Sequence, residues 1–180
     1  MRRRDRRDLS GPDLLDRTVT VPTGLNPEVW QPRLAEVDDS RVVARLLHDF
    51  NTEFGAASPG TDVIANRLRD LLAGDDTFAI LAGDPDCAVG LVTLRPNVWY
   101  QGRVALLDEL YVEPPRRGRG AGSALIQLML ETCRRRDVEL VEIHVDESDV
   151  DAQRFYLRHG FRWTEPGTDE HAFYFHQELD

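Results

Sequence analysis

One change of pattern, at residues 112–126, constrains this chain more than any other feature. The segment VEPPRRGRGAGSALI joins an apolar run that ends at Val112 to a second apolar run with a helical period. Between them, residues 116–122 hold three arginines and three glycines. Glycine is a poor helix former and arginine requires solvent or an anion, so this segment is neither a core strand nor an ordinary helix. The pattern predicts a strand, a cationic glycine-rich turn and then a helix.

A turn of this kind can bind an anion. The first N–H groups of a helix have no partner within the helix, and the helix dipole adds partial positive charge there. Gly118, Gly120 and Gly122 would let phosphate oxygens approach the backbone, and Arg117 would add a full charge. We interpret the turn as a phosphate or pyrophosphate site; the alternative is an arginine-rich surface loop.

Composition removes several classes of phosphate ligand. All 22 cationic side chains are arginine, so the lysine that an ATP-binding P-loop requires is missing. A dinucleotide-binding fingerprint would need glycine at position 123, where the chain has Ser123. The net charge of −10 disfavours nonspecific binding of nucleic acid, because a polyanion would be repelled.

The 180 residues suit one globular domain, which we place at residues 25–180. Residues 1–24, rich in arginine and aspartate, are predicted to be a flexible extension. No apolar run reaches the roughly 18 residues of a membrane helix, and no secretory signal is visible. Cys87 and Cys133 read as reduced residues, and the histidines show no metal-ligand spacing. We therefore expect a cytoplasmic protein without a metal site, for which a homodimer stays open.

Periodicity predicts a mixed α/β fold. Apolar residues at helical spacing predict two early helices, beginning near residues 38 and 61. Alternating apolar segments predict a hairpin at 77–96, a long strand at 102–112 and a strand at 138–145, with a short first strand open at 31–37. Helices are expected at 122–136 and 149–159, and a closing hairpin around Pro166 and Gly167.

The turn itself carries a family resemblance. Arg117-x-x-Gly120-x-Gly122, preceded by ELYVEP, resembles the coenzyme A signature of the GCN5-related N-acetyltransferase (GNAT) superfamily. The segment DVDAQRFYLRHGF is similar to the closing signature of that family, with matches at Ala152, Tyr156, Gly160 and Phe161. The resemblance covers residues 31–180. It implies a central mixed, mostly antiparallel sheet flanked by helices, in which the parallel strands 104–112 and 138–145 splay apart.

The resemblance implies acetyl-CoA as co-substrate and a cleft between the splayed strands. Backbone groups of Leu110, Tyr111 and Val112 would bind the pantetheine arm and polarise the thioester carbonyl. The pyrophosphate would be held at the turn by Arg117 and by the N–H groups of Gly118, Arg119, Gly120, Ala121, Gly122 and Ser123.

The implied reaction is direct transfer of an acetyl group to a primary amine within a ternary complex. Aromatic and acidic residues of the first helices and the last hairpin favour a small cationic acceptor; these are Phe50, Asn51, Glu53, Phe54, Trp99, Tyr100, Trp163, Glu165, Asp169 and Glu170. Two other functions stay open. The acceptor amine could belong to a protein or peptide, which predicts an open groove, or the domain could bind acyl-CoA without catalysis.

Three side chains are candidates for the proton transfers. An amine with a pKa of about 10.4 arrives protonated at neutral pH, so a base is required. Asp108 and Glu109 are adjacent acids, and because successive strand residues face opposite sides, only one is expected to point into the cleft. We favour Glu109. Tyr156 is the candidate that donates a proton or a hydrogen bond to the departing thiolate.

One position departs from the family pattern. The family often has asparagine three residues before the motif alanine, where this chain has Asp149. Aspartate is a good helix N-cap, so we interpret Asp149 as a cap; an alternative is that it binds the ammonium group of the acceptor.

Overall fold

The computed structural model describes residues 30–164, 169–171, 173, 175 and 177. The strands are β1 (Arg33–Leu34), β2 (Thr77–Gly83), β3 (Asp86–Pro96), β4 (Arg103–Val112) and β5 (Val138–Ile143). The α-helices are α1 (Ser40–Glu53), α2 (Thr61–Leu72), α3 (Ala121–Arg135) and α4 (Val150–Arg158), and the short 3-10 helices are η1 (Val37–Asp39) and η2 (Pro114–Arg116). The predicted extension at residues 1–24 lies outside the described residues.

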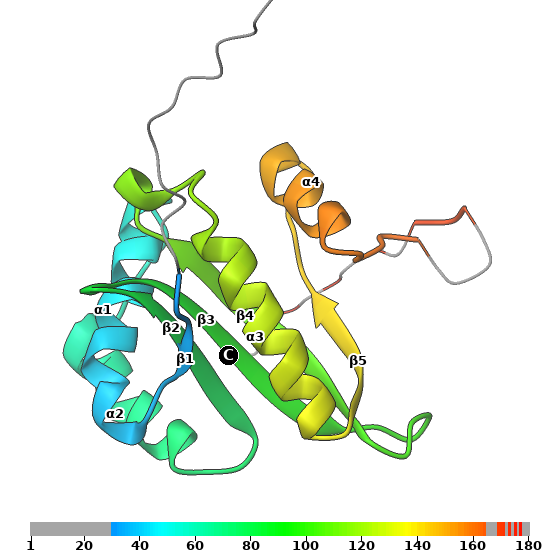
Figure 1. Ribbon diagram of the computed structural model, residues 1–180, viewed down its shortest axis with the longest axis horizontal. Helices are drawn as coiled ribbons and strands as arrows, with labels where there is room; N and C mark the ends of the chain where they lie inside the picture. Colours follow the sequence, from blue (N-terminus) through cyan, green and yellow to red (C-terminus); the bar gives the residue numbers. More distant parts are fainter. Residues whose placement is uncertain (1–29, 165–168, 172, 174, 176, 178–180) are drawn as a thin grey trace, which may run out of the picture.

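The described strands form one sheet in the order β1-β2-β3-β4-β5 (Figure 1). Neighbouring strands are antiparallel except β4 and β5, which run parallel. The crossover between these two contains the turn and α3, as a parallel connection requires. The predicted mixed, mostly antiparallel sheet flanked by helices is confirmed.

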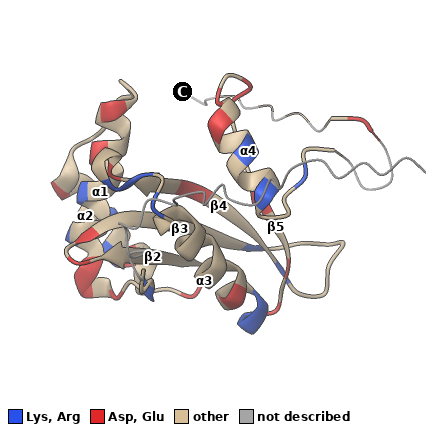
Figure 2. Ribbon diagram, turned by 45° about the horizontal axis from the view of Figure 1, so that its top comes forward, with Lys and Arg blue, Asp and Glu red and all other residues tan. Residues whose placement is uncertain are grey.

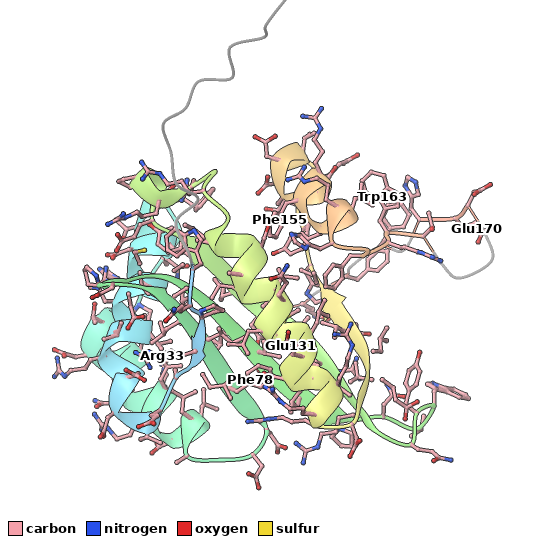
Figure 3. The ribbon with its side chains drawn as sticks, in the orientation of Figure 1. Arg33, Phe78, Glu131, Phe155, Trp163 and Glu170 are labelled. Atoms are coloured by element: carbon pink, nitrogen blue, oxygen red, sulfur yellow. The ribbon has the colours of Figure 1, made fainter. Side chains whose placement is uncertain are left out.

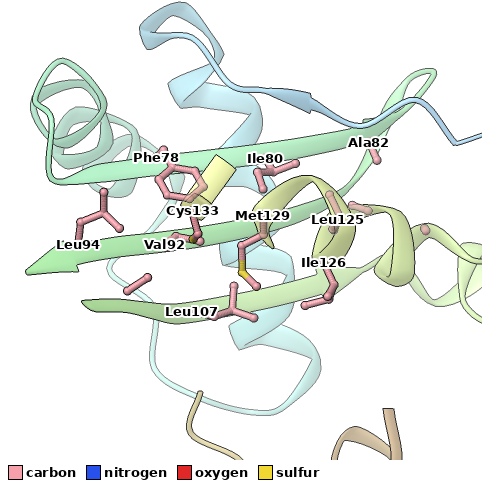
Figure 4. Close-up of a cluster of buried hydrophobic side chains, with 13 residues drawn as sticks. Phe78, Ile80, Ala82, Val92, Leu94, Leu107, Leu125, Ile126, Met129 and Cys133 are labelled. Atoms are coloured by element: carbon pink, nitrogen blue, oxygen red, sulfur yellow. The ribbon is translucent and has the colours of Figure 1, made fainter. Parts of the chain in front are cut away.

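Helices cover both faces of the sheet because its strands alternate between two apolar sets. In β2, Phe78 and Ile80 pack with α3, whereas Ala79 and Leu81 pack with α1 and α2 on the opposite face. Figure 4 shows the α3 side of this core, where the side chains of α3 are directed at the strands. Because each apolar set is buried on its own face of the sheet, the register of the central strands is fixed.

The parallel pair separates part-way along β4. Pairing with β5 runs from Arg103 to Leu107, while β4 continues to Val112. Helix α4 follows β5 and lies beyond its end, on the far side of the gap from α3 (Figure 1). The predicted splay is therefore present, and among the described residues the last part of β4 has no strand partner on that edge.

Some boundaries differ from those predicted. The first strand is only Arg33–Leu34, because η1 begins at Val37 and turns the chain into α1. The carboxylate of Asp39 does not cap α1 but accepts hydrogen bonds from Arg33 and from the N–H of Glu36. Of the closing hairpin, the described residues contain one antiparallel bridge, between Thr164 and His171, and Pro166 and Gly167 lie outside them. Within the described residues no helix has the length and apolarity needed to cross a membrane.

Candidate active site

A β-bulge in β4 determines how the two adjacent acids are presented. Leu91 of β3 pairs with Glu109, but the next residue of β3 pairs with Leu107, so Asp108 is the extra residue. A bulge interrupts the alternation of side chains along a strand. As a result, Asp108 and Glu109 line the same cavity, which differs from the alternation expected of successive strand residues.

This cavity, of about 370 Å3, lies between the sheet and the two early helices. Its size is near the lower end of the roughly 300 to 1,000 Å3 found for small-molecule sites. Half of its lining residues are apolar and half are polar or charged; they are Leu47, Asn51, Pro59, Ile64, Arg67, Leu68, Leu71, Thr77, Leu91, Thr93, Asp108 and Glu109.

The two acids differ in their surroundings. Burial raises the pKa of Glu109 to about 6, and the negative charge of Asp108 adds to the effect. Burial also raises the pKa of Asp108, but Thr93 opposes this shift by donating a hydrogen bond from Oγ1 to Oδ2 at 2.7 Å. The carboxylate of Glu109 has no hydrogen bond or ion pair within the described part of the chain. These surroundings favour Glu109 as the group that accepts a proton from an incoming amine.

Tyr156 lies on α4, packed edge-on against Phe155 and Phe161. Burial, together with the negative charges of Asp149 and Glu109, raises the pKa of its hydroxyl to about 12. The hydroxyl therefore keeps its proton at neutral pH and can donate a hydrogen bond. The influence of Glu109 on this pKa also means that the candidate acid and the candidate base share one electrostatic environment.

Asp149 caps α4. Its Oδ1 accepts a hydrogen bond from the backbone N–H of Ala152 at 2.9 Å. The interpretation of Asp149 as an N-cap is confirmed, and the cap holds the helix that carries Tyr156.

The arginine–glycine turn forms an open helix N-terminus. Gly118 and Gly120 have φ values of 72° and 95°, which favour glycine. Within the part of the chain that the structure describes, no side chain caps α3. The N–H groups of Ala121, Gly122 and Ser123, at the start of the helix, have no partner within it. The three predicted features of a phosphate cradle, namely a strand end, glycines with positive φ and a bare helix start, therefore occur together.

Neighbouring residues support this cradle from two sides. The indole N–H of Trp30 donates to the carbonyl oxygen of Arg119 at 2.7 Å. On the other side, a Cβ at Gly122 would lie 3.3 Å from the ring of Phe155, which sits between α4 and α3 (Figure 3). Ser123 Oγ lies 3.0 Å from Nε2 of His159, which links the first turn of α3 to the end of α4.

Arg117 is held by the protein itself. Its two terminal nitrogens donate to the two carboxylate oxygens of Glu53, each at 2.7 Å. Its Nε donates to the carbonyl oxygen of Val112 at 2.8 Å, and its guanidinium lies over the ring of Tyr111. In this arrangement Arg117 joins the turn to the end of α1 instead of directing its charge toward a phosphate.

The characteristic sequence pattern of the acetyltransferase (GNAT) family matches residues 43–161. The chain belongs to this family. It is thus an acyltransferase, and GNAT acetyltransferases use acetyl-CoA as the acetyl donor.

Related proteins agree with this membership. Aminoalkylphosphonate N-acetyltransferase of Salmonella typhimurium is 31% identical over 113 residues, which cover 56% of this chain and 73% of that enzyme. A protein from Arthrobacter sp. FB24 that is assigned as an acetyltransferase has a solved structure with 50% identity and a TM-score of 0.80, covering 87% of this chain and all of that one (100%). An aminoglycoside acetyltransferase from an uncultured soil sample, solved with sisomicin, shares the fold alone: identity is 17% and the TM-score 0.68, over 84% of this chain and 97% of that one.

The open edge of β4 fits the donor of a GNAT acetyltransferase. The N–H of Glu113 donates to the carbonyl oxygen of Cys87 on β3, and backbone groups alternate in direction along a strand. Those of Tyr111 therefore also face β3, while those of Leu110 and Val112 face the side from which β5 has separated. Of the three residues predicted to bind pantetheine, the geometry favours Leu110 and Val112 for backbone contacts, and the side chain of Tyr111 is buried with α1 and α2.

Among the residues expected on the acceptor side of this GNAT enzyme, Asn51 lines the cavity. Trp99 and Tyr100 lie in the loop between β3 and β4 instead, and Glu165 lies outside the described residues. Sequence reasoning missed Thr93 and Arg67. Arg67 could have been noticed, because it is a cation beside the apolar stripe of α2.

Proposed function

We propose that this protein transfers an acetyl group from acetyl-CoA directly to the primary amine of a small molecule, with both substrates bound together. The observation that carries the proposal is the bulge at Asp108, which brings two carboxylates into one cavity next to the open edge of β4. In this proposal, proton removal from the amine would take place beside the bound donor.

Glu109 is the proposed base. With a pKa of about 6 the carboxylate is mostly ionised at neutral pH, yet it is a stronger base than an ordinary glutamate. It can take the proton of an ammonium group directly or through a water molecule. Asp108, whose carboxylate is held by Thr93, would contribute negative charge that attracts the ammonium group into the cavity.

Tyr156 is the proposed acid. Its hydroxyl retains its proton at neutral pH and would donate a hydrogen bond to the sulfur as the thiolate leaves. Because the pKa of a thiol is about 8.5, complete proton transfer from a phenol with a higher pKa is uphill, so the hydrogen bond itself is the main contribution.

The donor would be held at the backbone. Acetyl-CoA supplies the activated acetyl thioester when it is bound. The N–H groups of Ala121, Gly122 and Ser123 would bind its pyrophosphate, together with those of Gly118 to Gly120. Leu110 and Val112 would offer their outward N–H groups to the pantetheine arm and the thioester carbonyl. Arg117 would act by keeping the turn in shape.

Several observations support a small acceptor that arrives as a cation. The cavity is small, and two acids lie on its floor. The net charge of −10 would attract a cation, and the Salmonella typhimurium relative is named for a small amine. An acyl-CoA sensor would have no use for a base with a raised pKa.

Two measurements test the proposal. The thermal midpoint should rise with acetyl-CoA but not with ATP or NAD; a ligand at 100 times its Kd adds about 2.7 kcal/mol of stability. Release of free coenzyme A should then depend on an added small amine and should be lost in Glu109→Gln. Glu131→Gln, a change on the exposed surface of α3, is the matched control. Binding of acetyl-CoA without turnover of any amine would support the sensor function instead.

A further inference from the structure

The wall of the cavity opposite β4 carries a positive charge. Three apolar residues of α2 line this wall, namely Ile64, Leu68 and Leu71, which lie on one stripe of the helix. Arg67 lies beside this stripe, three residues after Ile64, and also lines the cavity. Among the described residues that line the cavity, it is the one with a cationic side chain.

Arg67 has no hydrogen bond or ion pair within the described residues. Its neighbours on the same helix differ, since Arg69 donates to the side-chain oxygen of Asn66 at 3.2 Å and Asp62 pairs with Arg41. In the turn, the guanidinium of Arg117 donates hydrogen bonds to Glu53 and Val112. Arg67 therefore keeps its fork of N–H donors available, next to a cavity in which a ligand would sit.

The lining therefore carries negative charge on one side and positive charge on the other. Asp108 and Glu109 on β4 attract an ammonium group, whereas Arg67 on α2 attracts an anion; Figure 2 shows the acidic segment of β4 and the basic segments of α2. A diamine would bring a second positive charge toward Arg67. An amine with an uncharged tail would give the guanidinium no partner. A zwitterionic molecule satisfies both ends.

We propose that Arg67 binds an oxyanion on the acceptor, so that the preferred substrate is a short amine carrying a phosphonate, phosphate or carboxylate group. The proposal rests on the acetyltransferase function above and narrows its acceptor from a cation to a molecule with an ammonium group at one end and an anion at the other. Because the two acids and Arg67 line one cavity, a single short molecule can reach both charges.

The test compares acceptors that differ only at the tail. Coenzyme A release is measured with 2-aminoethylphosphonate, β-alanine, propylamine and 1,3-diaminopropane, for wild type, Arg67→Gln and the control Arg69→Gln. We expect wild type to prefer one of the two anionic amines by at least tenfold in kcat/KM over propylamine. Arg67→Gln should lose about tenfold or more with that amine and change less than about twofold with propylamine. Arg69→Gln should match wild type. Comparison of kcat/KM for 2-aminoethylphosphonate and β-alanine then shows whether a phosphonate or a carboxylate is preferred.

Three results would overturn the proposal: equal kcat/KM for anionic and uncharged amines, a preference for the diamine, or equal losses on all amines in Arg67→Gln. If no amine is acetylated, the proposed function fails, and binding decides the inference separately. In that case the two anionic amines are titrated calorimetrically into wild type and Arg67→Gln in the presence of coenzyme A. Binding that is lost in Arg67→Gln supports the oxyanion site, and its absence in wild type refutes it.

Discussion

Replacing Glu109 with glutamine should stabilise the protein at neutral pH while it removes most of the activity. Burial and the charge of Asp108 hold the pKa of this carboxyl at about 6, against an ordinary value of 4.5. That difference corresponds to about 2 kcal/mol, the free energy that the folded state loses when the carboxyl ionises. Solvent at the cavity screens part of it, so we expect about 1 kcal/mol.

The sign determines where in pH the effect appears. The folded state binds the Glu109 proton more tightly than the unfolded state, so the contribution to stability is complete below pH 4.5 and is lost as pH rises through about 6. The glutamine of Glu109→Gln stays uncharged at every pH, so the variant does not lose this stability as pH rises. Relative to wild type, the variant should therefore gain stability between pH 4.5 and pH 7, equivalent to a rise in Tm of about 2–4 °C at neutral pH.

The assay is urea unfolding at a series of pH values for wild type, Glu109→Gln and the surface control Glu131→Gln, with coenzyme A release measured on the same samples. Loss of a general base should lower kcat/KM by about 10²-fold or more, and wild-type kcat/KM should rise through pH 6. A stability difference that stays flat with pH would refute the buried-carboxyl argument. Unchanged activity in Glu109→Gln would refute its role as the base.

Three other changes test the supporting parts of the site. Tyr156→Phe should lower kcat about tenfold or more and leave the Kd for acetyl-CoA within about twofold; an unchanged kcat would exclude Tyr156 from the mechanism. Asp149→Ala should cost about 1 kcal/mol in urea unfolding, whereas Asp149→Asn should keep the cap and cost little; equal losses would argue against capping. Arg117→Gln and Glu53→Gln should each raise the KM for acetyl-CoA, while the free energy of unfolding falls by at most about 1 kcal/mol. The KM of the double variant should be no higher than that of either single variant, because the two side chains act as one pair. If the increases in KM were additive in the double variant, Arg117 would contact the donor independently of Glu53.

Local signals in the sequence were enough to predict the local structure of the glycine-rich turn and of the helix starts beside it. The start of α3 follows from glycines that must take positive φ and from the apolar period that begins just after them. The cap of α4 likewise depends on contacts within three residues of Asp149. These features involve near neighbours along the chain, so their physical causes can be read from the sequence.

The cavity that we propose for the acceptor depends on tertiary structure. The bulge at Asp108 depends on the register of β4 against β3, and without it the two acids would face opposite sides. The pairing of Arg117 with Glu53 joins residues 64 positions apart. Arg67 reaches the cavity only because α2 packs on the sheet face that carries those acids. Such contacts form between segments that are far apart in the sequence. The apolar pattern of one segment does not specify which other segment it packs against, so these contacts could not be predicted from it.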